Sequence, residues 1–355
     1  MKKVLVFSHE YPPCLGGAGT VAELLFNYFS SNVEEYDVTL LTSSRSQVIS
    51  SFDSKVVATQ GNPKLWPVCY RSWIKKYISK FDLIICNDSV SMYNAARYFN
   101  KEEMLKTVCI VHGEEKFLEE GLYPKLIGFK RYYKKALYSS KKVVFVSAFI
   151  KSTYSNKYNI DLNNSVVIHS GVSDNFINLV KHEPINQFSF VTVGRIEKNK
   201  GFDCMFEVLK TLIDSNKSVQ WNIVGDGGYF HEFEKLVVQT KYKDNINFLG
   251  KKSRDELPGI YNSHKYCISL SELNESYGLV FLEAASCGVI PIGYNRCGTK
   301  EAFSYIESGI LVDDYKDPIK IANFLLKEMY LMDKSQAKCY RNQTDFILEF
   351  IDNVV

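Results

Sequence analysis

The chain has 355 residues, of which 46% are hydrophobic and 23% are charged, so it is long enough for two globular domains of ordinary size. Its formal net charge of +3 is too small to indicate a nucleic-acid-binding protein, and an anionic partner would have to meet a local patch. The nine cysteines include no CxxC pair and no zinc-type cluster with histidine. This pattern favours free thiols in a reducing compartment and predicts no metal cofactor.

The N-terminus begins with two lysines and a short apolar run, Val4–Phe7. Because this run is shorter than the roughly 7–15 apolar residues of a secretory signal, we interpret it as the first strand of a sheet. No stretch reaches about 18 apolar residues, so we predict no transmembrane helix. We expect a cytoplasmic protein with peripheral attachment to the inner face of the plasma membrane.

Short, nearly continuous apolar runs alternate with longer helix-compatible segments along the chain. Such runs are typical of parallel strands covered by helices on both faces, which predicts an α/β, doubly wound fold. The strands expected in the first half are Val4–Phe7, Val38–Thr42, Leu83–Cys86, Val108–Val111 and Val143–Val146. Those expected in the second half are Phe188–Val193, Trp221–Val224, Ile246–Leu249, Tyr266–Ser269, Ile290–Ile292 and Ile310–Val312.

The hydrophobic pattern is interrupted between Asp174 and Gln187, where the sequence turns polar. We therefore predict two Rossmann-like domains, residues 1–175 and 185–335, and a C-terminal helix within residues 336–355 that crosses back to the first domain. Ligands of such sheets bind at the carboxyl ends of the strands. With two sheets facing each other, we expect the ligand in the cleft between them.

A glycine-rich loop follows the first expected strand. Its segment Gly17–Ala22 fits the GxGxxA dinucleotide fingerprint, but ten residues, Ser8 to Gly17, span the distance from the strand to the first glycine. The second strand also ends without the acid that would bind an NAD ribose. We therefore favour a glycine loop that opens a helix at the interdomain cleft. An NAD-dependent oxidoreductase remains a less favoured alternative.

His112 and Gly113 stand at the end of the strand Val108–Val111, where ligands of parallel sheets bind. A lone histidine is as often structural, and these residues alone leave both interpretations open.

Between this position and the middle of the chain, Lys125–Lys142 contains seven basic residues and no acid. Leu126, Phe129, Tyr133 and Leu137 recur there at helical spacing, and we favour packing of this stripe on the sheet. The basic face suggests contact with an anionic membrane surface.

Three motifs follow strands of the second half. Arg195 and Lys200, five residues apart in Gly194–Gly201, could clamp a diphosphate or form a solvated turn. Gly225 begins a glycine turn that could let a ligand approach the backbone or simply reverse the chain. Glu275 and Glu283 enclose an apolar run, and in one continuous helix they would lie about 12 Å apart on nearly the same face. The N-terminus of such a helix suits a phosphate.

Together these motifs resemble the family 4 retaining glycosyltransferases, which have the GT-B fold and an E-x7-E motif. The resemblance covers most of the chain in the right order. Its further elements are Glu10–Pro13 with Gly16 and Gly17, Val111–Gly113, Ile168–Val172, Gly194–Gly201, Phe248–Gly250, and Ala284–Gly288 with Gly298 and Glu301. The chain departs from the family pattern at His169-Ser170, His264-Lys265 and Leu270-Ser271, which bears on donor selectivity more than on reaction class.

The resemblance implies a role for each site residue. Arg195 and Lys200 would neutralise the diphosphate of a nucleotide-sugar donor, and the backbone amides near Gly278 and Leu279 would bind the same phosphates. Further roles fall on single side chains: Glu283 would hold the ribose, Glu275 would face the transferred sugar, and His112 would contact the sugar's hydroxyls. Gly16 and Gly17 would let the first domain close on the donor.

The expected activity is that of a metal-independent, retaining glycosyltransferase of the hexosyltransferase type. It would use a UDP- or GDP-sugar as substrate and no cofactor. The acceptor would be a glycan or lipid-linked glycan in the synthesis of a bacterial surface polysaccharide such as lipopolysaccharide. The alternatives are a sugar-nucleotide epimerase, a phosphorylase or a catalytically inactive binding protein.

Overall fold

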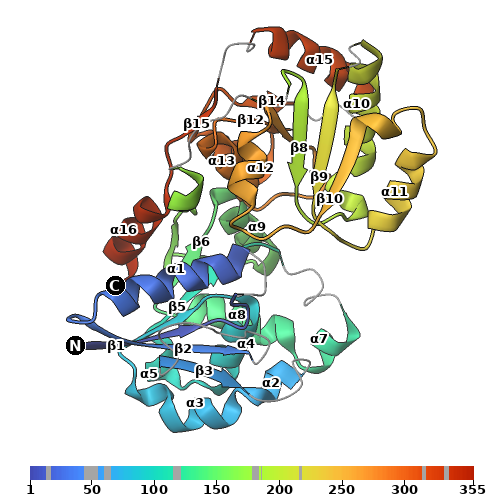
Figure 1. Cartoon of the computed structure of the whole chain (residues 1–355). Helices are drawn as coiled ribbons and strands as arrows, with labels where there is room; N and C mark the ends of the chain where they lie inside the picture. Colours follow the sequence, from blue (N-terminus) through green and yellow to red (C-terminus); the bar gives the residue numbers. More distant parts are fainter. Residues whose placement is uncertain are drawn as a thin grey trace. The chain divides into compact units, whose positions relative to one another are not determined.

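The computed structural model describes residues 1–12, 17–43, 55–59, 65–114, 121–177, 184, 186–215, 218–313, 317–331 and 336–355. These residues divide into two compact units (Figure 1): Met1–Ser170 with Thr344–Val355, and Gly171–Gln343. Each unit carries its own parallel sheet with helices between the strands, so the predicted α/β, doubly wound fold with two Rossmann-like halves is confirmed.

The sheet of the first unit has the order β3-β2-β1-β4-β5-β6-β7, with every pair parallel. Its strands are β1 (Lys2–Phe7), β2 (Tyr36–Ser43), β3 (Val56–Thr59), β4 (Leu83–Cys86), β5 (Thr107–Val111), β6 (Lys142–Phe145) and β7 (Ser165–Val167). Its helices are α1 (Gly17–Ser31), α2 (Trp66–Cys69), α3 (Arg71–Tyr77), α4 (Ser89–Tyr98), α5 (Lys101–Met104), α7 (Leu122–Leu126), α8 (Phe129–Ser139), α9 (Ala148–Tyr158) and α16 (Gln343–Val354).

Successive side chains of β1 point to opposite faces of the sheet and contribute to two hydrophobic cores in this unit. Leu5 and Phe7 join the hydrophobic cluster on one face of the sheet, whereas Val4 and Val6 join the cluster on the other. Because a strand that is buried on both faces needs apolar residues at successive positions, the apolar run Val4–Phe7 correctly predicted a strand of this kind. The C-terminal helix α16 belongs to the second of these cores through residues such as Phe350.

The sheet of the second unit has the order β10-β9-β8-β11-β12-β14 and is also parallel. Its strands are β8 (Ser189–Val193), β9 (Gln220–Val224), β10 (Ile246–Gly250), β11 (Tyr266–Ser269), β12 (Ile290–Tyr294) and β14 (Ile310–Val312). Its helices are α10 (Phe202–Ser215), α11 (Phe230–Val238), α12 (Leu257–Asn262), α13 (Leu279–Ser286), α14 (Cys297–Phe303) and α15 (Pro318–Leu331). A two-stranded antiparallel ladder, β13 (Ile306–Glu307) with β15 (Lys338–Cys339), completes the unit.

The eleven expected strands are all present, and of the strands in the two parallel sheets the sequence pattern missed β3 and β7. Both are edge strands of the first sheet. All three residues of β7 are only partly buried, so this strand lacks the strong apolar signal of a central strand. Among the described residues, no helix is both long enough and apolar enough to cross a membrane.

Candidate functional site

Two loops of the second unit meet through Lys200 and Glu275. The loop after β8 ends in a single helical turn, Lys198–Lys200, and the ammonium of Lys200 lies 2.6 Å from Oε1 of Glu275 in the loop after β11. Both side chains keep about 25% of their surface exposed to solvent. The structure therefore brings a cation and a carboxylate from two predicted motifs together at the carboxyl edge of the sheet.

Close backbone packing holds these loops in place. The amide of Glu272 donates to the carbonyl of Asn199, at 3.2 Å, and Gly201 adopts φ of +76° against the Leu270 backbone. A Cβ at Gly201 would lie 1.8 Å from the Leu270 carbonyl oxygen, so only glycine fits there. On the other side of the loop, the amide of Gly298 donates to the carbonyl of Glu275 at 3.0 Å.

The helix α13 begins later than the E-x7-E spacing suggested. Gly278 adopts φ of +96° and precedes the first helical residue, Leu279. The expectation that both glutamates lie on one face of a continuous helix is therefore wrong, because Glu275 stands in the loop before it. The loop brings Glu275 to Lys200, while the first amides of α13, at Leu279 and Val280, have no intrahelical acceptor and can bind an anion.

Glu283 occupies a different environment, inside α13. Its carboxylate is buried and lies 3.2 Å from Nη2 of Arg254, and the Tyr261 hydroxyl donates to it at 3.5 Å. Burial raises the pKa of Glu283 to about 7, although the guanidinium of Arg254 acts in the opposite direction. This carboxyl group therefore changes protonation near neutral pH.

Arg195 and Gly225 lie at the ends of neighbouring strands. Arg195 is exposed just after β8, and no ion pair joins it to another described residue. Gly225 follows β9 with φ of +143°, and a Cβ there would lie 1.8 Å from the carbonyl oxygen of Gly194. Packing between two strand ends thus accounts for this glycine.

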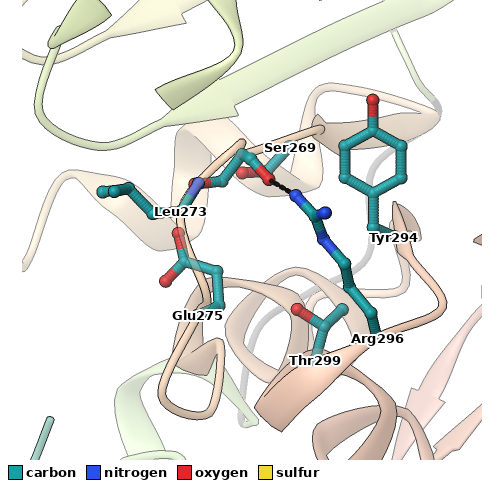
Figure 2. Close-up of a pocket in the computed structure, with 7 residues that line it drawn as sticks. Ser269, Leu273, Glu275, Tyr294, Arg296 and Thr299 are labelled. Atoms are coloured by element: carbon teal, nitrogen blue, oxygen red, sulfur yellow. Dashed lines mark hydrogen bonds between the residues drawn. The ribbon is translucent and has the colours of Figure 1, made fainter. Parts of the chain in front are cut away.

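A shallow pocket adjoins the Lys200–Glu275 pair, and Figure 2 shows Glu275 and Arg296 on opposite sides of it. A guanidinium nitrogen of Arg296 donates to the carbonyl of Ser271 at 3.0 Å, and the guanidinium lies over the ring of Tyr294. The residues that line the pocket are Ser269, Ser271, Leu273, Glu275, Tyr294, Arg296 and Thr299. Hydroxyl, carboxylate and guanidinium groups are therefore gathered in one place, beside the Lys200–Glu275 pair.

His112 lies at the end of β5, in a polar cluster of the first unit. Its Nε2 is 3.2 Å from Oδ1 of Asn87, which follows β4. Burial lowers the pKa of His112 to about 4, while the nearby carboxylate of Asp88 acts to raise it. Asp88 accepts from the amides of His9 and Glu10 beyond β1. Gly17 is the first residue of α1, and Gly16 lies outside the described residues.

The basic segment Lys125–Lys142 runs from the end of α7 through α8 to the first residue of β6. Phe129, Tyr133 and Leu137 are buried in the core, as expected, but Leu126 is 86% exposed. The expectation that Leu126 belongs to the packed stripe is wrong, because Gly128 separates the two helices with φ of +67°. The ammonium groups of Lys134, Lys135 and Lys141 donate to the backbone carbonyls of Tyr158, Ala96 and Val354.

Sequence reasoning missed Asn87, Asp88, Arg254 and Arg296. Asn87 and Asp88 directly follow β4, so the rule that ligands bind at strand ends could have found them as it found His112. Arg296 follows β12 in the same way. Arg254 carried no comparable signal, since its contact with Glu283 joins segments 29 residues apart, as the sequence numbers show.

Comparisons with known proteins show the family to which the chain belongs. The family model "Glycosyltransferase Family 4" matches residues 15–176, and the model "Glycosyl transferases group 1" matches residues 176–345. The 2-deoxystreptamine N-acetyl-D-glucosaminyltransferase of Niallia circulans is 23% identical over 249 residues, which is 70% of this chain and 60% of that protein. A 41.2 kDa protein in the cps region of Klebsiella pneumoniae is 30% identical over 177 residues, 50% of this chain and 44% of that one. The chain thus spans less than two thirds of the length of these curated relatives.

Solved structures share the fold over the whole chain. Anabaena Alr3699/HepE in complex with UDP and glucose has a TM-score of 0.73 at 15% identity, covering 100% of this chain and 99% of that one. The sucrose-phosphate synthase of Thermosynechococcus elongatus has a TM-score of 0.73 at 18% identity, covering 99% and 98%. With two parallel-sheet units and two adjoining family matches that together span residues 15–345, the chain belongs to the group 1, family 4 glycosyltransferases with the GT-B fold.

Proposed function

We propose that this glycosyltransferase is a retaining enzyme that takes a sugar from a nucleoside diphosphate donor, with UDP as the first nucleotide to test. The observation that carries the proposal is the contact between Lys200 and Glu275, at 2.6 Å, beside the start of α13. In this proposal the cation and the amides at the start of α13 bind the diphosphate of the donor, and the carboxylate faces its sugar.

The chemistry follows from how charge develops. As the bond between the sugar's anomeric carbon and the diphosphate oxygen breaks, negative charge grows on the diphosphate and positive charge on the sugar ring. Lys200, Arg195 and the amides of Leu279 and Val280 would stabilise the leaving diphosphate. Because these groups supply the positive charge, we propose that transfer needs no metal ion.

Glu275 is suited to the sugar side of the same bond. In the proposed reaction its carboxylate faces the positively charged ring, and Arg296 and Thr299, which line the same shallow pocket, lie beside it. The acceptor oxygen attacks on the face that the diphosphate leaves, which retains configuration, and its proton passes to the departing phosphate. His112 would bind a sugar hydroxyl, and Glu283 would bind the ribose.

We propose a glycan or lipid-linked glycan of a bacterial surface polysaccharide as the acceptor. The resemblance to the relative from the cps region supports this, as does the shared fold of WaaG, which is described as involved in lipopolysaccharide biosynthesis. The donor proposal is supported by the shared fold of Alr3699/HepE, which is described in complexes with UDP and with UDP-glucose.

A membrane-facing surface would suit a lipid-linked acceptor. Residues 65–80 and 121–142 together contain eleven lysines and arginines and no acidic residue. The same two segments carry the α2–α7 patch of exposed hydrophobic side chains, and the contact between the rings of Trp66 and Tyr123 links the two helices. The patch consists of Leu65, Val68, Leu122, Tyr123 and Leu126. Exposed leucines in segments rich in lysine and arginine suit the interface of an anionic membrane.

Thermal denaturation in the presence of UDP, GDP, ADP and NAD tests the donor class, because a ligand that binds only the folded protein raises its melting temperature. We expect a nucleoside diphosphate to stabilise the protein in the presence of EDTA. Stabilisation by NAD and by none of the diphosphates would contradict the proposal. Radiolabel transfer from the stabilising UDP- or GDP-sugar, followed by analysis of the anomeric configuration of the product, tests retention.

A further inference from the structure

The amide of Asn87 joins the start of α1 to His112. Its Nδ2 donates to the carbonyl of Ala18 at 2.7 Å and to the hydroxyl of Ser8 at 3.1 Å. Since a backbone carbonyl can only accept, the contact with Ala18 fixes which end of the amide carries the hydrogens. The oxygen Oδ1 must therefore be the atom that faces Nε2 of His112, at 3.2 Å.

This orientation determines where the imidazole carries its proton. Oδ1 can only accept, so Nε2 must donate and holds the proton of the neutral ring. The pKa of His112 is lowered to about 4 by burial, so the ring is neutral at pH 7. In a neutral Nε2–H imidazole, Nδ1 carries a lone pair. No described residue donates to Nδ1, and His112 as a residue is only partly buried at the end of β5.

The charged groups around His112 are compatible with a neutral imidazole that carries its proton on Nε2. The Asp88 carboxylate, which favours the protonated ring, is already occupied by the amides of Glu10 and Ser91, at 3.1 and 2.7 Å. Glu114, two residues beyond His112, lies 3.6 Å from the ammonium of Lys157. The neighbouring His9 is engaged through Nδ1 with the hydroxyl of Tyr70, at 2.8 Å.

We propose that Asn87 is a positioning residue that holds His112 as the neutral Nε2–H tautomer, so that Nδ1 accepts a hydrogen bond from a hydroxyl group of the sugar substrate. The contact with the sugar rests on the proposed function, whereas the tautomer does not. A histidine held in this way can accept a hydroxyl proton but cannot act as a cation toward the diphosphate. It would also disfavour a deoxy sugar that lacks the contacting hydroxyl.

Nitrogen NMR of the full chain tests the tautomer directly. Long-range proton–nitrogen spectra distinguish the two neutral forms and the imidazolium, and His112→Ala identifies the signals of this ring among the six histidines. We expect one neutral form at pH 7, with the proton on Nε2. Asn87→Leu, which cannot accept, should give a mixture of the two neutral tautomers. A proton on Nδ1, or a charged ring at pH 7, in the unchanged protein would overturn the inference.

Asn94→Leu is the matched control for the NMR measurement. Asn94 is also a buried amide, on α4, but it donates to the carbonyls of Trp66 and Val90 and does not contact His112. Its substitution should leave the His112 signals unchanged. A tautomer mixture in this variant as well would show that Asn87 has no specific effect on the ring.

Kinetics test the role in transfer. With the UDP-sugar donor, Asn87→Leu should lower kcat by roughly tenfold, which corresponds to the loss of one hydrogen bond between His112 and the sugar in the transition state. The Kd for UDP should stay unchanged. Asn87→Asp keeps an acceptor beside Nε2 but places a carboxylate there, which should raise the His112 pKa. Its kcat relative to that of the unchanged protein should then fall as pH is lowered from 8 towards 6.

The outcomes separate the two proposals. If Asn87→Leu is folded and shows the tautomer mixture yet transfers sugar at the full rate, the positioning role is wrong. If Asn87→Leu does not fold, a pH-independent kcat ratio for Asn87→Asp overturns the role. Absence of transfer from every nucleotide sugar would instead contradict the proposed function, and the NMR result would still decide the tautomer.

Discussion

The ammonium of Lys200 and the carboxylate of Glu275 lie 2.6 Å apart, although 75 positions separate them in the sequence. Their strands, β8 and β11, are neighbours in the sheet, so the loops that follow them start side by side. In the proposed reaction Lys200 binds the diphosphate and Glu275 faces the sugar. The pair would therefore mark the position of the bond that breaks.

Substitution of Lys200 by alanine should weaken UDP binding by about 1.5–3 kcal/mol, because a hydrogen bond between charged groups is lost. Arg195→Ala should have a similar effect. Isothermal titration calorimetry measures both. Lys198→Ala is the control, since Lys198 belongs to the same helical turn but is mostly exposed and lies near Glu232, at 3.6 Å. Equal loss of affinity in all three variants would point to a general charge effect.

Substitution of Glu275 by alanine should reduce kcat more than it reduces donor affinity. The carboxylate would stabilise positive charge on the sugar ring, which develops mainly in the transition state. Its removal also frees Lys200 for the diphosphate, which offsets part of any loss in binding. Steady-state kinetics and UDP titration on the same variant separate the two quantities. A full transfer rate in Glu275→Ala would rule out the role assigned to this carboxylate.

Glu283 should make stability depend on pH. Its pKa rises from 4.5 to about 7 in the folded protein, so the folded state binds more protons than the unfolded state between these values. Stability should therefore fall as pH rises through this window, by roughly 3 kcal/mol from this group. Glu283→Gln should lack this contribution and gain stability relative to the unchanged protein from pH 5 to pH 8.

Urea unfolding followed by tryptophan fluorescence measures the effect of Glu283. Of the three tryptophans, Trp221 is the one in the second unit, so Trp66→Phe and Trp73→Phe leave a reporter for that unit alone. A constant stability difference between Glu283→Gln and its parent across this pH range would show that the carboxyl group titrates normally.

Substitution of Gly298 by alanine should disturb the loop that carries Glu275. An added Cβ would lie 2.1 Å from the carbonyl oxygen of Ser276, so the loop must move. We expect reduced transfer activity with a lower melting temperature. Gly259→Ala is the control, because a Cβ there meets nothing within 4 Å and alanine favours the helix α12 by up to about 1 kcal/mol. Full activity of Gly298→Ala would show that the position of the loop is unimportant.

The double substitution Leu122→Ser and Leu126→Ser should weaken binding to anionic vesicles. The two side chains are 81% and 86% exposed, and their burial in the lipid interface would favour binding. Sedimentation with vesicles of phosphatidylglycerol and phosphatidylcholine, against phosphatidylcholine alone, measures this. Leu348→Ser, at another exposed leucine of the first unit, should have no effect. Equal binding by all three proteins would exclude the α2–α7 patch.

The sequence by itself determined the class of fold and the candidate residues. Central strands such as β1 and β4 are buried on both faces, so nearly every residue in them must be apolar. The resulting continuous apolar runs can be recognised in the sequence without a structure. The motifs of the second half, including Arg195 to Lys200 and the two glutamates, could be found because they come after such apolar runs in the sequence.

Only the tertiary structure decided which of these side chains meet. The order of strands places Lys200 beside Glu275, and a left-handed backbone at Gly278 starts α13 after Glu275 instead of before it. Burial raises the pKa of Glu283 in spite of the opposing charge of Arg254, and the contact with Asn87 assigns the proton of His112. These properties depend on distances between segments remote in the sequence, because hydrogen bonds and charge interactions act over a few ångströms in space.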